Sequence, residues 1–184
     1  MILTVSERGQ FVATMRYVNV WLMETLATWV PTSPEMEVKL LFGEQIWDVA
    51  QHADALGKRT FELRMPLQHS SQPSESYVAL LAAIRPIAAT HERLASVYDV
   101  VLPGLAKRYQ HYLEKTDALA DAPTVRILER HLMDMGRMGA AGRKIREDLP
   151  ALRMNDPSWG QALAERESTI EIRAGTAVAE RTGA

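Results

Sequence analysis

The stretch Gly43-Glu-Gln-Ile-Trp-Asp-Val-Ala-Gln-His-Ala-Asp-Ala-Leu-Gly-Lys-Arg59 decides the fold class, because it reads as the middle of a long helix with a mixed inner face. Upstream of it, Ser33 and Pro34 are typical of an N-cap and a first helical residue, so we expect the helix to run from there to about Leu63. A period near 3.6 places these residues on its inner side: Phe42, Gln45, Val49, His52 and Leu56.

Three further long helices are expected around this one. Residues 10–29 show apolar positions at helical spacing and end before Pro31. Residues 87–115 form the third helix, with a kink near Pro103. Asp121 is a candidate cap for the fourth helix, which runs to about residue 146. The serine- and proline-containing residues 65–76 form the longest connection, and a short helical pattern follows from Tyr77 to Pro86.

The two ends of the chain carry weaker patterns. Residues 1–5 are expected as a short strand or an ordered arm at the edge of the domain. Residues 151–184 are expected as one last short helix anchored by Trp159, Leu163 and Ile170, with a fraying tail from Gly175. We assign residues 1–150 to a helical bundle and treat the C-terminal part as belonging to the same domain.

The amino-acid composition excludes some classes of function. The 184 residues are 47% hydrophobic, which is enough for one core. Lysine and arginine number 21 against 23 aspartate and glutamate residues, and no basic run is interleaved with aromatics, so nucleic acid is not an expected partner. There is no cysteine and no long uncharged apolar stretch. We expect a soluble cytoplasmic protein without a membrane partner.

Two segments resemble ferritin-like proteins of the di-iron carboxylate type: the opening stretch and Asp121-Ala-Pro-Thr-Val-Arg-Ile-Leu128. The resemblance covers residues 10–146 and implies an all-α, ferritin-like four-helix bundle with a long crossover between the second and third helices. It also implies a ligand pattern. The first and third helices each supply a carboxylate, and the second and fourth each supply a Glu-x-x-His pair, since residues three apart share one face.

Most of these ligands are missing here. The first Glu-x-x-His pair falls on Val49 and His52, and the second falls on Met135 and Met138. Opposite the second pair only Asp99 offers a carboxylate. With so few carboxylate ligands, the positive charge of two divalent ions would be poorly neutralised. We therefore expect no di-iron centre and no cofactor.

Five polar residues fall on the inward faces of the expected bundle. They are Asn19, Gln45, His52, Asp99 and His131. One interpretation is structural: His52 hydrogen-bonds Asp99 or a backbone carbonyl, Asn19 pairs with Gln45, and the methionines fill the volume of the lost ligands. A second is a small-molecule pocket in the bundle centre, where His52 and Asp99, together with His131, perform acid–base chemistry. A third is a rebuilt mononuclear metal site made by the same three residues.

These interpretations give three function hypotheses. The first is a metal-independent ferritin-like enzyme of a specialised biosynthetic pathway, with His52, Asp99 and His131 as catalytic residues. Its candidate substrate-binding residues are Asn19, Gln45, Asp48, Val49, Met135 and Met138. The second is a non-catalytic scaffold or partner subunit, and the third is an iron-dependent oxygenase. Four tryptophans suffice for a core plus an interface, so a homodimer is expected.

Overall fold

The computed structural model describes residues 3–153 and 158–170, and every regular element within these ranges is helical. This confirms the all-α class. None of the described helices is both long and apolar enough to cross a membrane. The elements are α1 (Val5–Trp29), α2 (Met36–Glu62), α3 (Glu75–Ile84), α4 (Thr90–Ala95), a π-helical turn (Ser96–Val101), α5 (Leu102–Lys115), α6 (Ala122–Asp148), a 3-10 turn (Pro150–Leu152) and α7 (Ser158–Ser168).

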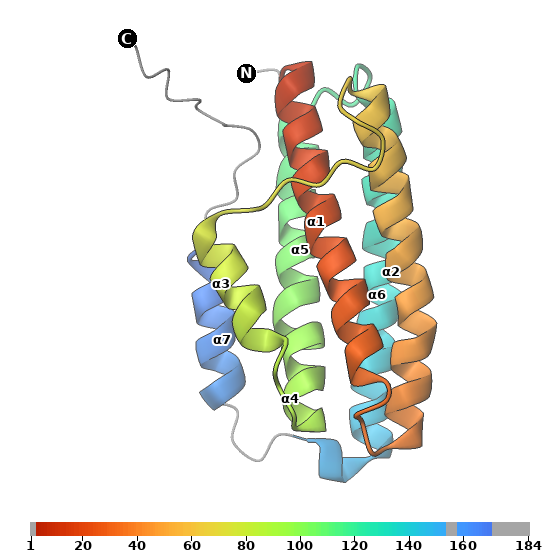
Figure 1. Cartoon of the computed structure of the whole chain (residues 1–184), viewed down its shortest axis with the longest axis vertical. Helices are drawn as coiled ribbons and strands as arrows, with labels where there is room; N and C mark the ends of the chain where they lie inside the picture. Colours follow the sequence, from red (N-terminus) through yellow and green to blue (C-terminus); the bar gives the residue numbers. More distant parts are fainter. Residues whose placement is uncertain (1–2, 154–157, 171–184) are drawn as a thin grey trace.

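Four long helical segments lie side by side and enclose the core (Figure 1). The helices α1 and α2 form an antiparallel hairpin, α6 lies beside α2, and α5 lies beside α6. The ring closes between α5 and α1, where Phe11 stacks on Tyr112 with centroids 4.1 Å apart. Residues 63–89 return along the bundle and carry α3, so α2 and α5 run in the same direction. The order of two helices, a crossover and two helices is therefore the expected one.

The two short helices α3 and α7 lie next to α5, away from α2 and α6 (Figure 1). Arg108 on α5 connects them, because it pairs with buried Glu167 on α7 and lies 4.4 Å above the ring of Tyr77 on α3. Ile170 is buried against the core, as expected for an anchor of the last helix. The tail from Gly175 onward lies outside the described residues.

The first helix begins earlier than the sequence pattern indicated. Thr4 is the N-cap of α1, and its hydroxyl accepts the N–H of Glu7 while the Glu7 carboxylate accepts the N–H of Thr4. This reciprocal capping box starts the helix at Val5 instead of Gln10. The expectation of a strand is wrong for residues 3–5, and residues 1 and 2 lie outside the described part.

The expected cap of the second helix is also wrong. Glu35 takes the N-cap position of α2, and Ser33 belongs to the turn before it. The hydroxyl of Ser33 donates to the carbonyl of Trp29 and accepts from Arg93. Ser33 therefore closes the end of α1, so its side chain is not available to α2.

A π-helical turn, Ser96–Val101, ends two residues before Pro103, where we expected a kink. Proline has no N–H to donate, and its ring crowds the carbonyl four residues earlier, which is that of Asp99. The wider π turn accommodates both effects. It also adds a residue to the turn, so the α-helical period used to assign inward residues fails across this segment.

Three glycines on α6, at positions 136, 139 and 142, differ in how closely other side chains approach them. A Cβ atom at Gly142 would lie 2.4 Å from the ring of Tyr98, so only glycine fits there. Nothing lies within 4 Å of a Cβ at Gly136, and at Gly139 the nearest atom, on Arg143, is 3.7 Å away. Of these three glycines, Gly142 alone packs closely against another described residue.

Candidate functional site

Two buried histidines from neighbouring helices form a stacked pair. His52 on α2 and His131 on α6 have ring centroids 3.9 Å apart and planes inclined by 26°. Both residues are 2% exposed. The two residues were expected on inward faces, and the structure brings them together.

The carboxylate partner of His52 is Asp134, which the sequence analysis did not propose. The Nε2 atom of His52 lies 3.1 Å from Oδ2 of Asp134, a side chain that is 23% exposed. Asp134 also accepts a hydrogen bond from Arg137 at 3.0 Å. A histidine that donates its Nε2 proton to a carboxylate keeps its lone pair on Nδ1, which is the tautomer of a general base.

The expected pairing of His52 with Asp99 is wrong. Asp99 lies in the π-helical turn, where its side chain is 48% exposed and forms two hydrogen bonds with Arg146, at 2.7 and 3.0 Å. The added residue of the π turn rotates Asp99 away from the bundle interior. Asp99 therefore cannot act together with His52.

Both histidines are held in their neutral form. Burial lowers the pKa of His52 below its ordinary value of 6.5, although the hydrogen bond that His52 donates to Asp134 acts in the opposite direction. Burial lowers the pKa of His131 to about 2, and the neighbouring His52 and Arg130 add to this effect. The Nδ1 atom of His131 is buried and has no hydrogen-bond partner among the residues that the structure describes. At neutral pH the pair is thus uncharged, with one polar atom unsatisfied.

The other inward polar residues are buried, but their partners differ from the expected ones. Asn19 donates to the hydroxyl of Tyr109 at 2.8 Å, and Gln45 accepts from the hydroxyl of Tyr98 at 2.7 Å. The expected Asn19–Gln45 pair is therefore wrong. The ring of Tyr109 lies 5.9 Å from that of His131, so Asn19 joins the histidine pair through a tyrosine.

The apolar candidates from the degenerate ligand positions belong to the core. Val49, Met135 and Met138 are 1%, 5% and 2% exposed and pack in the main hydrophobic cluster. They fill the bundle centre beside the histidine pair.

A surface hollow of about 530 Å³ opens between α2 and α6 beside the histidine pair. It lies at the side of the bundle, whereas the sequence analysis placed the pocket at the centre. Both histidines and Asp134 line it, and so does Asp48, which accepts a hydrogen bond from Arg137 at 3.1 Å. The remaining lining residues are Trp47, Gln51, Asp54, Ala55, Lys58, Arg126, Ile127, Arg130 and Arg137.

Within residues 3–153 and 158–170, no group of three or more histidine, aspartate or glutamate side chains is arranged to hold a metal ion. The expected mononuclear set of His52, His131 and Asp99 is wrong in its geometry, because Asp99 pairs with Arg146.

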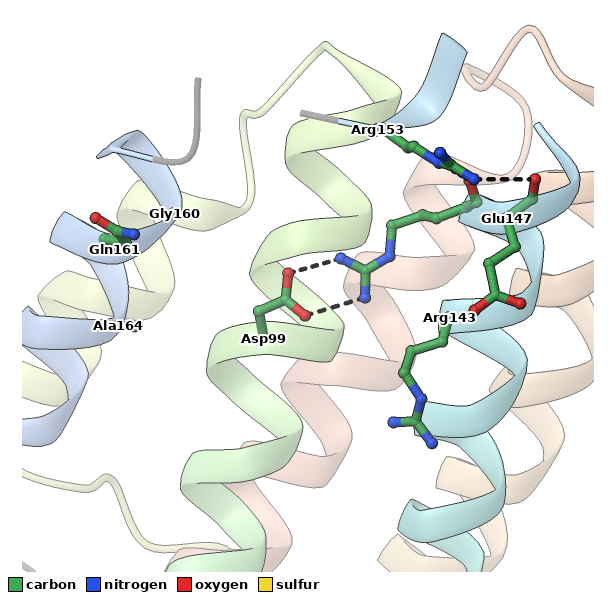
Figure 2. Close-up of a pocket in the computed structure, with 8 residues that line it drawn as sticks. Asp99, Arg143, Glu147, Arg153, Gly160, Gln161 and Ala164 are labelled. Atoms are coloured by element: carbon green, nitrogen blue, oxygen red, sulfur yellow. Dashed lines mark hydrogen bonds and ion pairs between the residues drawn. The ribbon is translucent and has the colours of Figure 1, made fainter. Parts of the chain in front are cut away.

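A second hollow, of about 450 Å³, lies between α6 and α7 (Figure 2). The Asp99–Arg146 ion pair and Arg153 line it on one side, and Gly160, Gln161 and Ala164 face it from α7. Arg153 donates to the backbone carbonyls of Arg146 and Glu147 and so caps the end of α6. These side chains complete the helix end, which favours a structural role.

Asp134, which the sequence analysis missed, left a usable signal. His131 and Asp134 are three residues apart, a spacing that puts them on one face of a helix. Asp48 and His52 have the same property at four residues, and antiparallel packing of α2 on α6 brings the two pairs together. Arg126 and Arg130 left no such signal, because both are exposed. They become candidate site residues only because they line the hollow.

Comparison with known proteins gives no relative. No protein-family model matches the chain, and no curated protein or solved structure matches it either.

Proposed function

We propose that this protein binds a small organic molecule in the hollow between α2 and α6 and that His52 acts there as an acid–base group. The observation that carries the proposal is the buried His52–His131 pair in the wall of a 530 Å³ hollow. Ligand sites are concave, measure roughly 300–1,000 Å³ and carry a few convergent polar groups with perturbed pKa values.

The geometry supports a general base at His52. Its Nε2 atom is fixed by Asp134, and the carboxylate stabilises the imidazolium that forms when Nδ1 takes a proton. Arg137 holds Asp134 in place from the next turn of α6. His131 is neutral and contributes a flat ring surface against His52 together with an unsatisfied Nδ1 atom.

We further propose that the bundle is ferritin-like and that its ligand positions have been replaced. The chain order of two helices, a crossover and two helices supports this relationship, as do the core positions of Val49, Met135 and Met138. In such a protein apolar side chains fill the volume of the lost ligands. The reactive side chains then lie at the side of the bundle instead of at its centre. A role in a biosynthetic pathway remains part of this proposal.

A ligand screen with a paired variant tests the proposed function. Wild-type protein and His52→Gln are screened against a library of small metabolites by thermal shift, and each hit is then assayed for conversion by mass spectrometry. His111→Gln is the matched control, since His111 lies on α5 and does not line the hollow. We expect conversion by wild type and the control but not by His52→Gln. Equal conversion by all three proteins would contradict the proposal.

A second candidate function, a protein-binding role, is favoured by a row of exposed apolar side chains on α2. Met36 and Leu40 are 61% and 67% exposed, and Gly43 after them has open space above it. Their spacing of four and three residues matches a helix-packing seam. We propose that a second copy of the chain covers this row, which agrees with the expected homodimer. Light scattering of wild type and Leu40→Glu tests it: a dimer that becomes a monomer supports the pairing, and a monomeric wild type contradicts it.

A further inference from the structure

We infer that the hollow between α2 and α6 takes an elongated anion: a molecule with a flat apolar end at Trp47 and a carboxylate or phosphate at Arg126 and Arg130. This inference rests on the proposed function, because it names the class of molecule that the same hollow binds. It is carried by the distribution of paired and unpaired charges along the hollow and by one exposed aromatic ring.

The charges that line the hollow are four cations and three carboxylates, and all three carboxylates are already engaged. Asp48 pairs with Arg137, and Asp134 pairs with both Arg137 and His52. Asp54 pairs with Lys58 at 2.6 Å and accepts a hydrogen bond from Gln68. These contacts leave no carboxylate of the lining for another cation.

Arg126 and Arg130 are the lining cations without an ion-pair or hydrogen-bond partner among the described residues. They lie four residues apart on α6, so both face the hollow from successive turns. The charge of Arg130 also acts on both histidines, since it disfavours their protonated forms. A ligand anion at this end would meet two guanidinium groups that are free to pair with it.

The opposite end of the hollow carries Trp47, whose side chain is 67% exposed. The Asp48–Arg137 pair puts Trp47 at the level of Arg137, and seven residues separate Arg137 from Arg130. Seven residues of helix correspond to about 10 Å. The histidine pair lies between the two ends, so a ligand that spans them would place its middle atoms beside His52.

Two probes that differ only in charge test the inference. These are 1-pyrenebutyrate, which has a flat ring system joined to a carboxylate by three methylene groups, and its neutral analogue 1-pyrenebutanol. Fluorescence anisotropy measures the binding of each probe to wild type, Arg130→Gln, Trp47→Ala and Arg143→Gln. Arg143→Gln is the control, because Arg143 lines the other hollow and has no partner there among the described residues.

We expect wild type to bind the carboxylate more tightly than the alcohol. Since a hydrogen bond to a charged group contributes appreciably to affinity, Arg130→Gln should weaken carboxylate binding about tenfold and change alcohol binding by less than about twofold. Trp47→Ala should weaken both probes, by about fivefold. Arg143→Gln should behave as wild type.

Equal affinity for both probes, no effect of Arg130→Gln, or a loss caused by Arg143→Gln would each overturn the inference. The absence of binding by both probes would also overturn it. Failure of the proposed function is distinguishable from these results. If the alcohol binds as tightly as the carboxylate and Trp47→Ala weakens the binding of both, the result supports the binding site but contradicts an anionic ligand. If the carboxylate binds as expected while His52→Gln converts every substrate normally, the anionic class stands and the catalytic role of His52 fails.

Discussion

The rings of His52 and His131 stack at 3.9 Å, although α3, α4 and α5 lie between their two helices in the sequence. Two imidazoles at this distance repel each other when both are protonated, and burial disfavours even one positive charge. The pair therefore makes the stability of the folded protein depend on pH. It also makes the pKa of His52 depend on Asp134, the carboxylate to which this ring is hydrogen-bonded.

Protonation of the histidine pair should reduce stability below pH 6.5. The pKa of His131 is about 2 in the folded chain against an ordinary value of 6.5, so the unfolded state binds more protons between these values. Stability is therefore complete above pH 6.5 and is lost as the pH falls. We expect the free energy of unfolding to fall by up to about 1.4 kcal/mol per pH unit for this residue. His131→Gln should lack this part of the slope, as measured by urea denaturation between pH 5 and pH 8, whereas His111→Gln should retain it. An identical slope in wild type and His131→Gln would contradict the buried neutral ring.

Replacing the partner of His52 should lower the pKa of that histidine further. The Asp134 carboxylate opposes the effect of burial, so Asp134→Asn removes the group that stabilises the protonated ring. Asp99→Asn is the control, because Asp99 pairs with Arg146 on the other side of α6. NMR titration of the ring protons should show a decrease in the pKa of His52 for Asp134→Asn only. A decrease for Asp99→Asn would instead support the pairing that the sequence suggested.

The buried Asp121 should be essential for the fold. Its side chain is fully buried and accepts hydrogen bonds from Arg59, Tyr112, Thr116 and Thr124, which join α2, α5 and α6. Without Asp121, buried Arg59 keeps only the exposed Glu62 as a charge partner, so Asp121→Ala should cost about 3–5 kcal/mol of stability. The exposed Asp148→Ala, which breaks the pair with Lys144, should cost less than about 1 kcal/mol. Chemical denaturation of both variants measures the difference, and similar losses would contradict the network.

Two glycines on one helix should respond to alanine with opposite signs. At Gly142 a Cβ would lie 2.4 Å from the ring of Tyr98, so Gly142→Ala should destabilise the protein by about 1–3 kcal/mol. At Gly136 a Cβ meets nothing within 4 Å, and alanine should stabilise the helix by up to about 1 kcal/mol. Thermal melts of the two variants give the comparison. Stabilisation by both substitutions would show that α6 and the π turn do not pack as described.

Helical periodicity predicted much of the bundle and part of the site. It placed Asn19, Gln45, His52 and His131 on inward faces, and all four are buried. It failed at Asp99 because a period of 3.6 does not hold through a π turn, and the sequence gives no direct sign of the turn beyond Pro103. Partner choice could not be predicted either, since it depends on the rotation of each helix about its axis. Gln45 and Asn19 thus meet tyrosines of the third helical segment instead of each other.

The hollow itself could not be predicted from one sequence. Trp47, Arg126 and Arg130 are exposed residues on two helices, and their proximity follows only from the packing of α2 on α6. The Thr4–Glu7 capping box, in contrast, was visible as a Thr-x-x-Glu pattern and would have corrected the start of α1.

The measurement that tests the central claim most directly is an NMR titration of the five histidine ring signals with a library of small organic molecules. Ligands that bind should shift the ring signals of His52 and His131 while those of His69, His91 and His111 stay in place. If the molecules that bind shift the other histidines and leave His52 and His131 unchanged, or if none of the library binds, the hollow between α2 and α6 is not the ligand site.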